Sequence, residues 1–529
     1  MLRTLSTRLS SWPGIGTWQS GLLLTLIIAV VAVVIRVNYL PLMPIDETRY
    51  LSVAWEMWQN NSFLVPHLNG EPYPDKPPLL FWLIQSAWAL FGTSDVVARL
   101  AIPAVGLLTF PLLVAIQREW PEQQAPGMRW APPVLLAMTM WFVYMPLSMF
   151  DILQTTCLLI ATLGWVRYVH RAERRWLVLA GFGLGLALLA KGPVVLIYWL
   201  PLTLSTRFWR PDGVTIGARH YWAILPATLL GAAVVLAWAI PAAITGSPEY
   251  AQAIFWGQSA GRVTNAFAHA RPWYWYLPLL PLLTLPWPTV WLWRRPLASG
   301  SLERFALWGC LPPLVILSLV SGKQVHYLMP ALPFLAIWVA GQIERHPPRR
   351  TWLYRLLLLV LAGLMLALPE IALRFYPLAP LPNAVRLTAL VPLALIVGLS
   401  LHPRRVIMTL AWPLSLLALL IGLSPALARY YDVTPFAREI GYQQQQGVPV
   451  AYVGDYANQF RFLGRLTQDM TVIDSDEVIA WSADHPQGAL IEVVDTLSPA
   501  QRAGALFSQP YRGSFLVLMP SARHGLLDR

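Results

Sequence analysis

Long apolar stretches, separated by short polar connections, occupy most of the chain up to residue 427. A helix of about 20 apolar residues crosses the ~30 Å hydrocarbon core of a bilayer, so the pattern predicts a polytopic helical membrane protein. The apolar stretches cover residues 19–37, 78–92, 96–116, 130–149, 151–169, 176–190, 193–206, 220–244, 273–293, 305–321, 326–342, 352–373, 385–401 and 406–427.

Arginine-rich connections give the orientation, because basic loops stay on the cytoplasmic side. If all fourteen stretches crossed, Asp46 would be cytoplasmic while Arg3 and Arg8 lay outside. The 78–92 stretch is short and follows a proline-rich cluster, so we expect it not to cross. This leaves thirteen transmembrane helices, an inside N-terminus and an outer loop, 38–95, that carries interfacial or re-entrant helices. The basic connections are Arg167/Arg171/Arg174/Arg175, Arg207/Arg210/Arg219, Arg294/Arg295/Arg304, Arg345/Arg349/Arg350/Arg355 and Arg404/Arg405.

The last hundred residues have a different pattern. Short β-type runs at Val448–Val453, Ala489–Val494 and Ser514–Met519 alternate with helical or polar stretches such as Ser498–Phe507. The sequence therefore predicts a small α/β domain at 429–529, on the outer face of a membrane domain at 1–428.

Composition supports the membrane assignment and narrows the function. Hydrophobic residues make up 56% of the 529 and charged residues 12%, about half the charged share of a soluble domain. The net charge of +12 comes mostly from arginines in short loops, which indicates membrane orientation and not a nucleic-acid partner. Cys157 and Cys310 lie in separate apolar stretches and form no recognisable disulfide or metal pattern.

Charged and polar residues gather at the outer ends of the predicted helices. Charge so close to lipid is costly, so such residues are candidates for function. Cations there suit the phosphate of a lipid, and a carboxylate opposite suits deprotonation of a hydroxyl. We expect these residues to meet in one pocket at the outer leaflet. They are Asp46, Glu47, Arg49 and Tyr50; Asp75 and Lys76; Asp151; Arg262, His269 and Arg271; and Lys323, His326 and Tyr327.

Structural roles are the alternative for each candidate. Asp46 and Asp151 could cap the helices that follow them, and Glu47 could complement a helix dipole. Lys323 could extend its amine from the membrane to water, and Lys191 could be a solvated loop lysine.

Five motifs follow one another along the chain. They are Asp46-Glu-Thr-Arg-Tyr50, Asp75-Lys-Pro-Pro-Leu79, Lys191-Gly-Pro193, His269-Ala-Arg-Pro-Trp-Tyr274 and Lys323-Gln-Val-His-Tyr-Leu328. In this order they resemble the GT-C glycosyltransferases, specifically the bacterial branch that holds the aminoarabinose transferases acting on lipid A and the related protein O-mannosyltransferases. The resemblance covers nearly all of residues 20–430, with a similar periplasmic domain beyond.

The resemblance implies a GT-C fold and an inverting enzyme that moves a sugar from a polyprenyl phosphate to an acceptor hydroxyl. Asp46 matches the family's catalytic carboxylate, and we add Glu47 and Asp151 as further catalytic candidates. The expected donor-phosphate residues are Arg49, Tyr50, Lys76, Arg262, Lys323, His326 and Tyr327. The expected remaining cavity residues are Asp75, Lys191, His269 and Arg271.

One departure concerns metal. Members of the branch often carry a Glu-His pair where this chain has Gln258-Ser259, so we predict no required metal or other cofactor. The sequence predicts a monomeric inner-membrane enzyme whose site faces the periplasm, with aminoarabinose as donor sugar and lipid A or another envelope glycan as acceptor. A protein acceptor is the alternative within this chemistry. A lipid-linked sugar transporter is the alternative of another class, but it would favour charges at the membrane midplane and repeated halves.

Overall fold

The computed structural model describes residues 17–121, 125, 127–256, 270–290, 300–346, 351–375, 381, 383–401 and 405–526. Nine helical segments in these ranges are long and apolar enough to cross a membrane, which confirms the helical membrane fold. The count of thirteen spans stays a prediction. The nine are Trp18–Tyr39, Asp95–Gln117, Phe150–Arg171, Ala218–Thr245, Ser301–Leu319, Val325–Arg345, Trp352–Arg374, Ala384–Leu401 and Arg405–Gln445.

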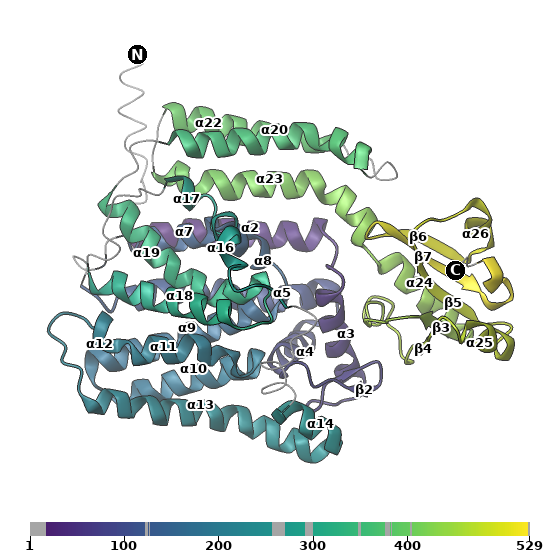
Figure 1. The fold of residues 1–529 in the computed structure, drawn as a ribbon, viewed down its shortest axis with the longest axis horizontal. Coiled ribbons are helices and arrows are strands. Elements are labelled where there is room, and N and C mark those ends of the chain that lie inside the picture. The colour runs from purple at the N-terminus through teal and green to yellow at the C-terminus, as the bar shows by residue number, and fades with distance from the viewer. Residues whose placement is uncertain are drawn as a thin grey trace.

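The long helices run side by side, and the C-terminal domain lies at one end of the bundle (Figure 1). The membrane domain contains α2 (Trp18–Tyr39), α3 (Asp46–Gln59), β1 (His67–Leu68), β2 (Glu71–Pro72), α4 (Leu79–Phe91), α5 (Asp95–Leu107), α6 (Thr109–Gln117), α7 (Ala131–Ala137), α8 (Thr139–Tyr144), α9 (Phe150–Arg171), α10 (Arg175–Lys191), η2 (Pro193–Val195), α11 (Leu196–Leu204), α12 (Thr206–Trp209), α13 (Ala218–Thr245), α14 (Pro248–Gln252), α16 (Tyr276–Leu283), α17 (Trp287–Val290), α18 (Ser301–Leu319), η5 (Val325–Ala331), α19 (Leu332–Arg345), α20 (Trp352–Phe375), α21 (Ala384–Thr388), α22 (Leu390–Leu401) and α23 (Arg405–Tyr431).

Helix α9 forms the centre of the bundle, and most of its residues are buried. Its closest neighbour is α10, and glycines permit the contact. A Cβ atom on Gly164 would lie 2.4 Å from the backbone nitrogen of Ala180, and one on Gly183 would lie 2.4 Å from that of Ala161. Small residues are what membrane helices use to approach closely, because little hydrophobic force acts between helices in lipid.

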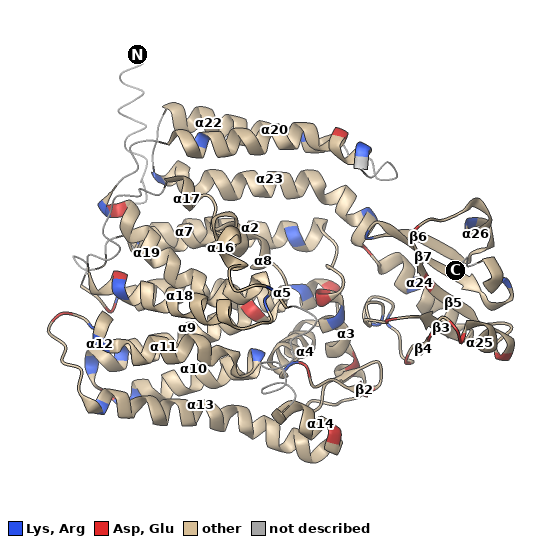
Figure 2. Cartoon of the chain, viewed as in Figure 1, with Lys and Arg blue, Asp and Glu red and all other residues tan. Residues whose placement is uncertain are grey.

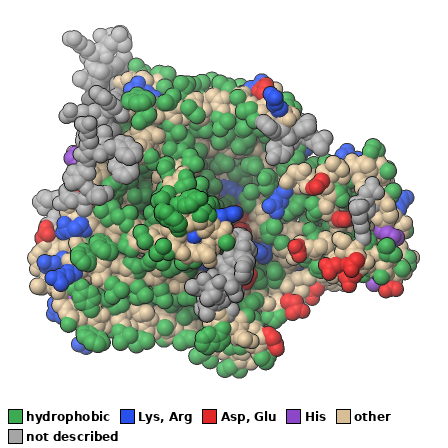
Figure 3. All heavy atoms as spheres, viewed as in Figure 1, with side chains coloured by type: hydrophobic (Ala, Val, Ile, Leu, Met, Phe, Trp, Pro, Cys, Tyr) green, Lys and Arg blue, Asp and Glu red, His purple; other side chains and the backbone are tan. Residues whose placement is uncertain are grey.

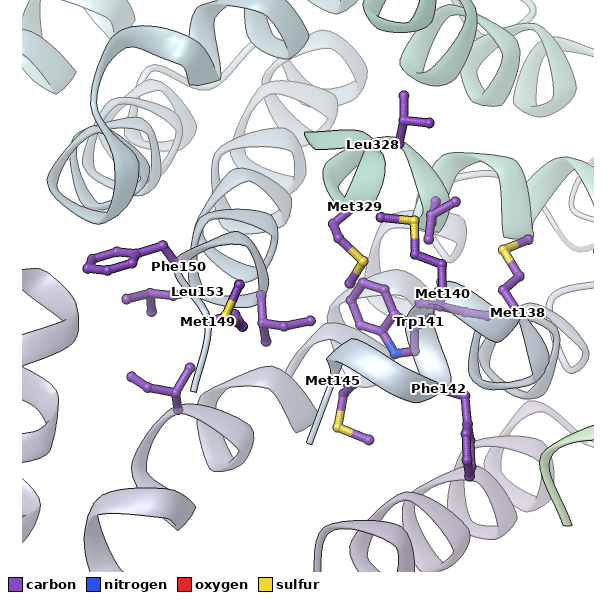
Figure 4. Packing of buried hydrophobic residues seen from close by; sticks show 14 of the residues in the cluster. Met138, Met140, Trp141, Phe142, Met145, Met149, Phe150, Leu153, Leu328 and Met329 are labelled. Atoms are coloured by element: carbon purple, nitrogen blue, oxygen red, sulfur yellow. The ribbon is translucent and has the colours of Figure 1, made fainter. Parts of the chain in front are cut away.

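The predicted span at 130–149 is two helices. Helix α7 ends at Ala137, Met138 is extended, and α8 runs only to Tyr144. Large apolar side chains fill the space around this break. Figure 4 shows the ring of Trp141 on α8 beside Met329 of η5. This packing joins α8 to η5, the element that carries His326.

The 38–95 loop folds into short elements at the end of the bundle that adjoins the C-terminal domain. These are α3, the β1–β2 hairpin and α4 (Figure 1). Helix α4 has 13 residues, and at 1.5 Å per residue it is about 20 Å long. This is shorter than the ~30 Å of hydrocarbon, and the interfacial placement of 78–92 stays a prediction.

Charge is distributed as the sequence predicts. Figure 2 shows the middles of the long helices almost without charge, and basic residues gathered near α12 and the start of α13. These lie at the end of the bundle away from the C-terminal domain, whereas α3 and α14 lie at the end near it. The described arginines near α12 and the start of α13 therefore lie at the opposite end of the bundle from α3, which carries Asp46.

The C-terminal domain has a five-stranded sheet in the order β4-β3-β5-β7-β6. Strands β3, β4 and β5 are parallel, and β7 is antiparallel to both β5 and β6. The sheet confirms the predicted α/β fold. Its elements are α24 (Thr434–Gln445), β3 (Val450–Val453), β4 (Thr471–Ile473), α25 (Val478–Asp484), β5 (Ala489–Val494), α26 (Pro499–Gly504), β6 (Phe507–Tyr511), β7 (Ser514–Pro520) and η6 (Ser521–Leu526).

Residues 461–470 of this domain, here the docking loop, pack against α3. The backbone N–H of Phe462 donates to Ser52 Oγ at 3.2 Å, and Trp55 Nε1 donates to the carbonyl of Leu466 at 3.4 Å. Asn69, between β1 and β2, exchanges two hydrogen bonds with the backbone of Met470, at 2.9 and 2.7 Å. The two domains are therefore joined by specific hydrogen bonds as well as by chain connectivity.

A buried ion pair strengthens this contact. Glu56 on α3 is fully buried and accepts hydrogen bonds from the backbone of Asn69 at 3.0 Å and Gly70 at 2.7 Å. Arg461 lies 3.4 Å from the same carboxylate and also pairs with Asp469. Because a buried charge is tolerated only when it is paired, these residues fix the register of the docking loop on α3.

Candidate functional site

A cavity of about 400 Å³ opens beside the start of α3. Its walls are mostly apolar and come from α2, the 142–149 segment and α23. Asp46, Glu47 and Arg36 are charged residues of the lining, and Gln324 and His326, at the start of η5, contribute further polar atoms. In Figure 3 a hollow with acidic and basic atoms is visible near the C-terminal domain. An apolar cavity with charge at one end suits an amphiphilic ligand.

Asp46 is in the first turn of α3, where an acid interacts favourably with the helix dipole. The N-cap is Ile45, so Asp46 is not the cap. Its carboxylate accepts from Arg49 at 2.7 Å and from the Tyr50 hydroxyl at 3.4 Å. The side chain of Asp46 is still 47% exposed, which leaves carboxylate surface available to a ligand.

Tyr50 is a neutral hydrogen-bond donor to Asp46. Burial, with the nearby charge of Asp46, raises the pKa of the Tyr50 hydroxyl well above its ordinary value. The phenol therefore keeps its proton and can donate it to the carboxylate. Its ring also packs edge-on against Phe150 at 4.8 Å, which links α3 to the start of α9.

Glu47 is placed differently from Asp46. It is buried, pairs with Arg36 at 2.7 Å, and accepts from the backbone N–H groups of Met43 and Ser148, both at 3.0 Å. These contacts connect α2, the α2–α3 linker and the segment before α9. The geometry supports a positioning role for Glu47 at the base of Asp46.

Asp151, at the start of α9, forms a second charged cluster. Its carboxylate lies 2.5 Å from Lys191 Nζ and 3.9 Å from His326 Nε2, and it is almost fully buried. Met149 is the N-cap of α9, so Asp151 is not the cap. Lys191 also lies 4.6 Å from the ring centre of Tyr327. Thus Lys191 is the partner of a buried acid and not a solvated loop lysine.

Charges from separate loops act on His326. Asp151, Lys191, Asp46 and Lys76 all interact with its imidazole electrostatically. The fold therefore brings these five predicted residues near one another from five separate segments. Their catalytic or binding roles stay predictions.

The 73–79 segment contributes less to the cavity than expected. Lys76 Nζ donates to the carbonyl of Asp75 at 3.3 Å, and neither residue lines the cavity beside Asp46. Lys76 is near enough to act on His326. Any contact of Lys76 with a ligand in this cavity would need its side chain to reach toward the mouth.

Lys323 also lies outside that cavity lining. Its amine donates to the carbonyl of Arg271 at 3.0 Å and to that of Val320. Burial lowers the pKa of Lys323. Arg271 N–H donates in turn to Ser321 at 3.1 Å, so these contacts join two outer loops. The amine of Lys323 thus holds the two outer loops together. Its predicted contact with the phosphate of the sugar donor stays a prediction.

Arg262, His269 and the Gln258-Ser259 pair lie outside the described residues. Among the residues that are described, no group of three or more His, Cys, Asp or Glu side chains could hold a metal ion. The absence of a metal requirement therefore stays a prediction.

The sequence analysis missed Arg36 and Tyr144, which both line the cavity. Arg36 could have been found, because it is the one arginine within the first apolar stretch and charge there needs a reason. Tyr144 carries no such signal. It reaches the cavity only because α8 ends there, with its ring 6.1 Å from that of His326.

Comparisons with known proteins agree with this fold. Residues 75–240 match the family described as dolichyl-phosphate-mannose-protein mannosyltransferase. The protein named undecaprenyl phosphate-alpha-4-amino-4-deoxy-L-arabinose arabinosyl transferase in Pseudomonas savastanoi pv. phaseolicola is 30% identical over 320 residues, 57% of each chain. The protein of the same name in Shewanella sediminis is 29% identical over 316 residues, 56% of this chain and 55% of that one. The matched region thus spans little more than half of each relative.

Solved structures match over a longer range. The crystal structure of ArnT from Cupriavidus metallidurans bound to undecaprenyl phosphate superimposes with a TM-score of 0.76 at 20% identity, over 94% of this chain and 98% of that one. The apo structure gives a TM-score of 0.73. These matches show that the chain has the fold of the ArnT structures, as its resemblance to the aminoarabinose transferases predicts. The chain is a multi-pass membrane protein of that fold.

Proposed function

We propose that this protein, a membrane protein with the fold of the aminoarabinose transferases, transfers a sugar from a polyprenyl phosphate to an acceptor hydroxyl. One observation carries the proposal. A half-exposed carboxylate, Asp46, stands at the charged end of a mostly apolar cavity. The relatives named as undecaprenyl phosphate-aminoarabinose transferases and the ArnT complex with undecaprenyl phosphate support this donor class.

The proposed reaction needs one general base and cations placed near the leaving phosphate. The acceptor oxygen attacks the anomeric carbon, the bond from that carbon to the phosphate oxygen breaks, and Asp46 takes the hydroxyl proton. Attack opposite the leaving phosphate inverts the anomeric centre. The leaving group is already a phosphate, so nearby cations can stabilise its developing charge. Lys191 and Lys76 are the cations we assign to this task, and the imidazole of His326 can donate a hydrogen bond to the phosphate.

The likeness to the aminoarabinose transferases favours 4-amino-4-deoxy-L-arabinose as the sugar and lipid A or another envelope glycan as the acceptor. The described arginines near α12 and the start of α13 lie at the end of the bundle away from Asp46, which supports an inner-membrane protein with its site in the periplasm. A protein acceptor is the second candidate, because residues 75–240 match a protein mannosyltransferase family.

Mass spectrometry of lipid A and envelope glycans, from cells with and without this chain, tests the proposal. The expected result is one additional sugar mass on one acceptor class in cells that carry the chain. A chain with Asp46→Asn should be inserted normally and leave the acceptor unmodified. Unchanged envelope glycans and proteins in cells carrying the native chain would overturn the transferase assignment, and a modified acceptor with Asp46→Asn would remove Asp46 as the base.

A further inference from the structure

A second cavity, of about 310 Å³, lies between α24, the start of α5 and the end of the 461–465 segment. We call it the junction cleft. Its charged lining consists of Arg438, Arg465 and Asp95, and Tyr442 and Gln445 add polar atoms. Two arginines against one aspartate leave it a net charge of +1. No part of the proposed transfer reaction uses it.

Backbone packing brings the two arginines together. A Cβ atom on Gly464 would lie 2.3 Å from the carbonyl oxygen of Ala437, and one on Gly441 would lie 2.6 Å from that of Gly464. Only glycine permits this approach between α24 and the loop. Because Arg438 follows Ala437 and Arg465 follows Gly464, the contact sets their backbones side by side at the cleft.

Arg465 is held in place before any ligand arrives. It donates to the carbonyl of Phe462 at 2.8 Å and pairs with Asp95 at 2.7 Å. Its guanidinium lies 4.1 Å from the ring centre of Phe462 and 5.0 Å from that of Trp55. The side chain is still 37% exposed. Arg438, on α24, is exposed. An ordered guanidinium beside an exposed one suits the oxygens of a phosphate.

The cleft lies at the expected membrane boundary. Asp95 is the first residue of a helix apolar enough to span, and α24 continues directly from the α23 span. Large apolar side chains near Asp95 are exposed: Val96 by 48%, and Leu90 and Phe91 at the end of α4 by 76% each. A headgroup in the cleft could therefore keep its acyl chains against an apolar surface.

We infer that the junction cleft binds the phosphate of an anionic membrane lipid. Two guanidinium groups beside an exposed apolar surface suit a headgroup that carries a phosphate. Free inorganic phosphate shares the charge but lacks the chains that the exposed apolar residues would contact. The inference does not depend on the proposed transferase activity.

Titration calorimetry of the full chain in a zwitterionic detergent tests this, with dihexanoyl phosphatidic acid as the probe. Arg438→Gln should weaken binding about tenfold or more, since it removes one of two cations. Asp95→Asn should strengthen it, because the net charge of the cleft rises from +1 to +2. Added salt should weaken it in both. Arg502→Gln, which changes an exposed arginine on α26, is the matched control and should bind as the native chain does.

Two results would overturn the inference. If Arg438→Gln and Asp95→Asn both bound phosphatidic acid as the native chain does, the lipid would be bound elsewhere. If inorganic phosphate bound as tightly as phosphatidic acid, and with the same response to Arg438→Gln, the cleft would be a site for free anions. The Arg465–Asp95 pair is partly exposed, so Asp95→Asn should cost little stability. An unchanged unfolding midpoint confirms that the variants are folded.

Discussion

The Arg36–Glu47 pair gives the sharpest test of which carboxylate acts in chemistry. Both side chains are buried, at 8% and 3% exposure, and Glu47 accepts from two backbone N–H groups in addition. In Glu47→Gln the amide NH₂ must face one of these donors, and Arg36 loses its counter-charge. Removing one partner of a buried pair costs about 3–5 kcal/mol. We expect about 3 kcal/mol here, since the glutamine oxygen keeps part of the contact.

Unfolding in mixed SDS–detergent micelles, followed by tryptophan fluorescence, measures this loss. The matched control is Glu173→Gln, because Glu173 pairs with Arg175 at an exposed site, with 43% and 69% exposure. An exposed pair is worth at most about 1 kcal/mol. A double-mutant cycle with Arg36→Met should return a coupling of about 1–3 kcal/mol. If Glu47→Gln left stability within about 0.5 kcal/mol of native and still abolished transfer, Glu47 would act in the reaction, and our assignment would be wrong.

Three more predictions concern the site. Lys76→Ala should raise the Kd for a polyprenyl phosphate and leave acceptor affinity unchanged, and equal donor binding would remove its phosphate role. Lys191→Met leaves Asp151 buried without its 2.5 Å partner, so it should lower stability by about 3 kcal/mol and abolish transfer; a stable, active variant would show that the pair is dispensable. Dialysis against EDTA should not change the transfer rate, whereas a loss that Mn²⁺ or Zn²⁺ restores would show a metal requirement.

Much of the fold follows from hydrophobic pattern. The runs that predict β3, β5 and β7 are the three central strands of the sheet, and they are rich in buried apolar residues. The edge strands β4 and β6 escaped prediction because an edge strand needs less apolar pattern. Strand β6 also contains Pro510, which argues against a strand unless it lies at an edge.

The sequence predicts which residues form the candidate site better than it predicts how they are arranged. Charge at membrane boundaries marks Asp46, Asp151 and His326, which the fold brings near one another. Pattern cannot distinguish Asp46 from Glu47, since only the path of α2 decides which carboxylate meets Arg36. Pattern also cannot show that the amine of Lys323 turns to backbone carbonyls, because that depends on how two distant loops meet.

The docking loop limits how this protein can be rebuilt. Helix α3 carries Asp46 at one end and, through Ser52, Trp55 and Glu56, the contacts to the C-terminal domain along its length. In a chimera that takes only the C-terminal domain from a related chain, the new docking loop would not match the side chains of α3. A chimera should therefore exchange α3 and the β1–β2 hairpin together with the C-terminal domain. Otherwise we expect α3 to shift and to move Asp46 out of its place in the cavity.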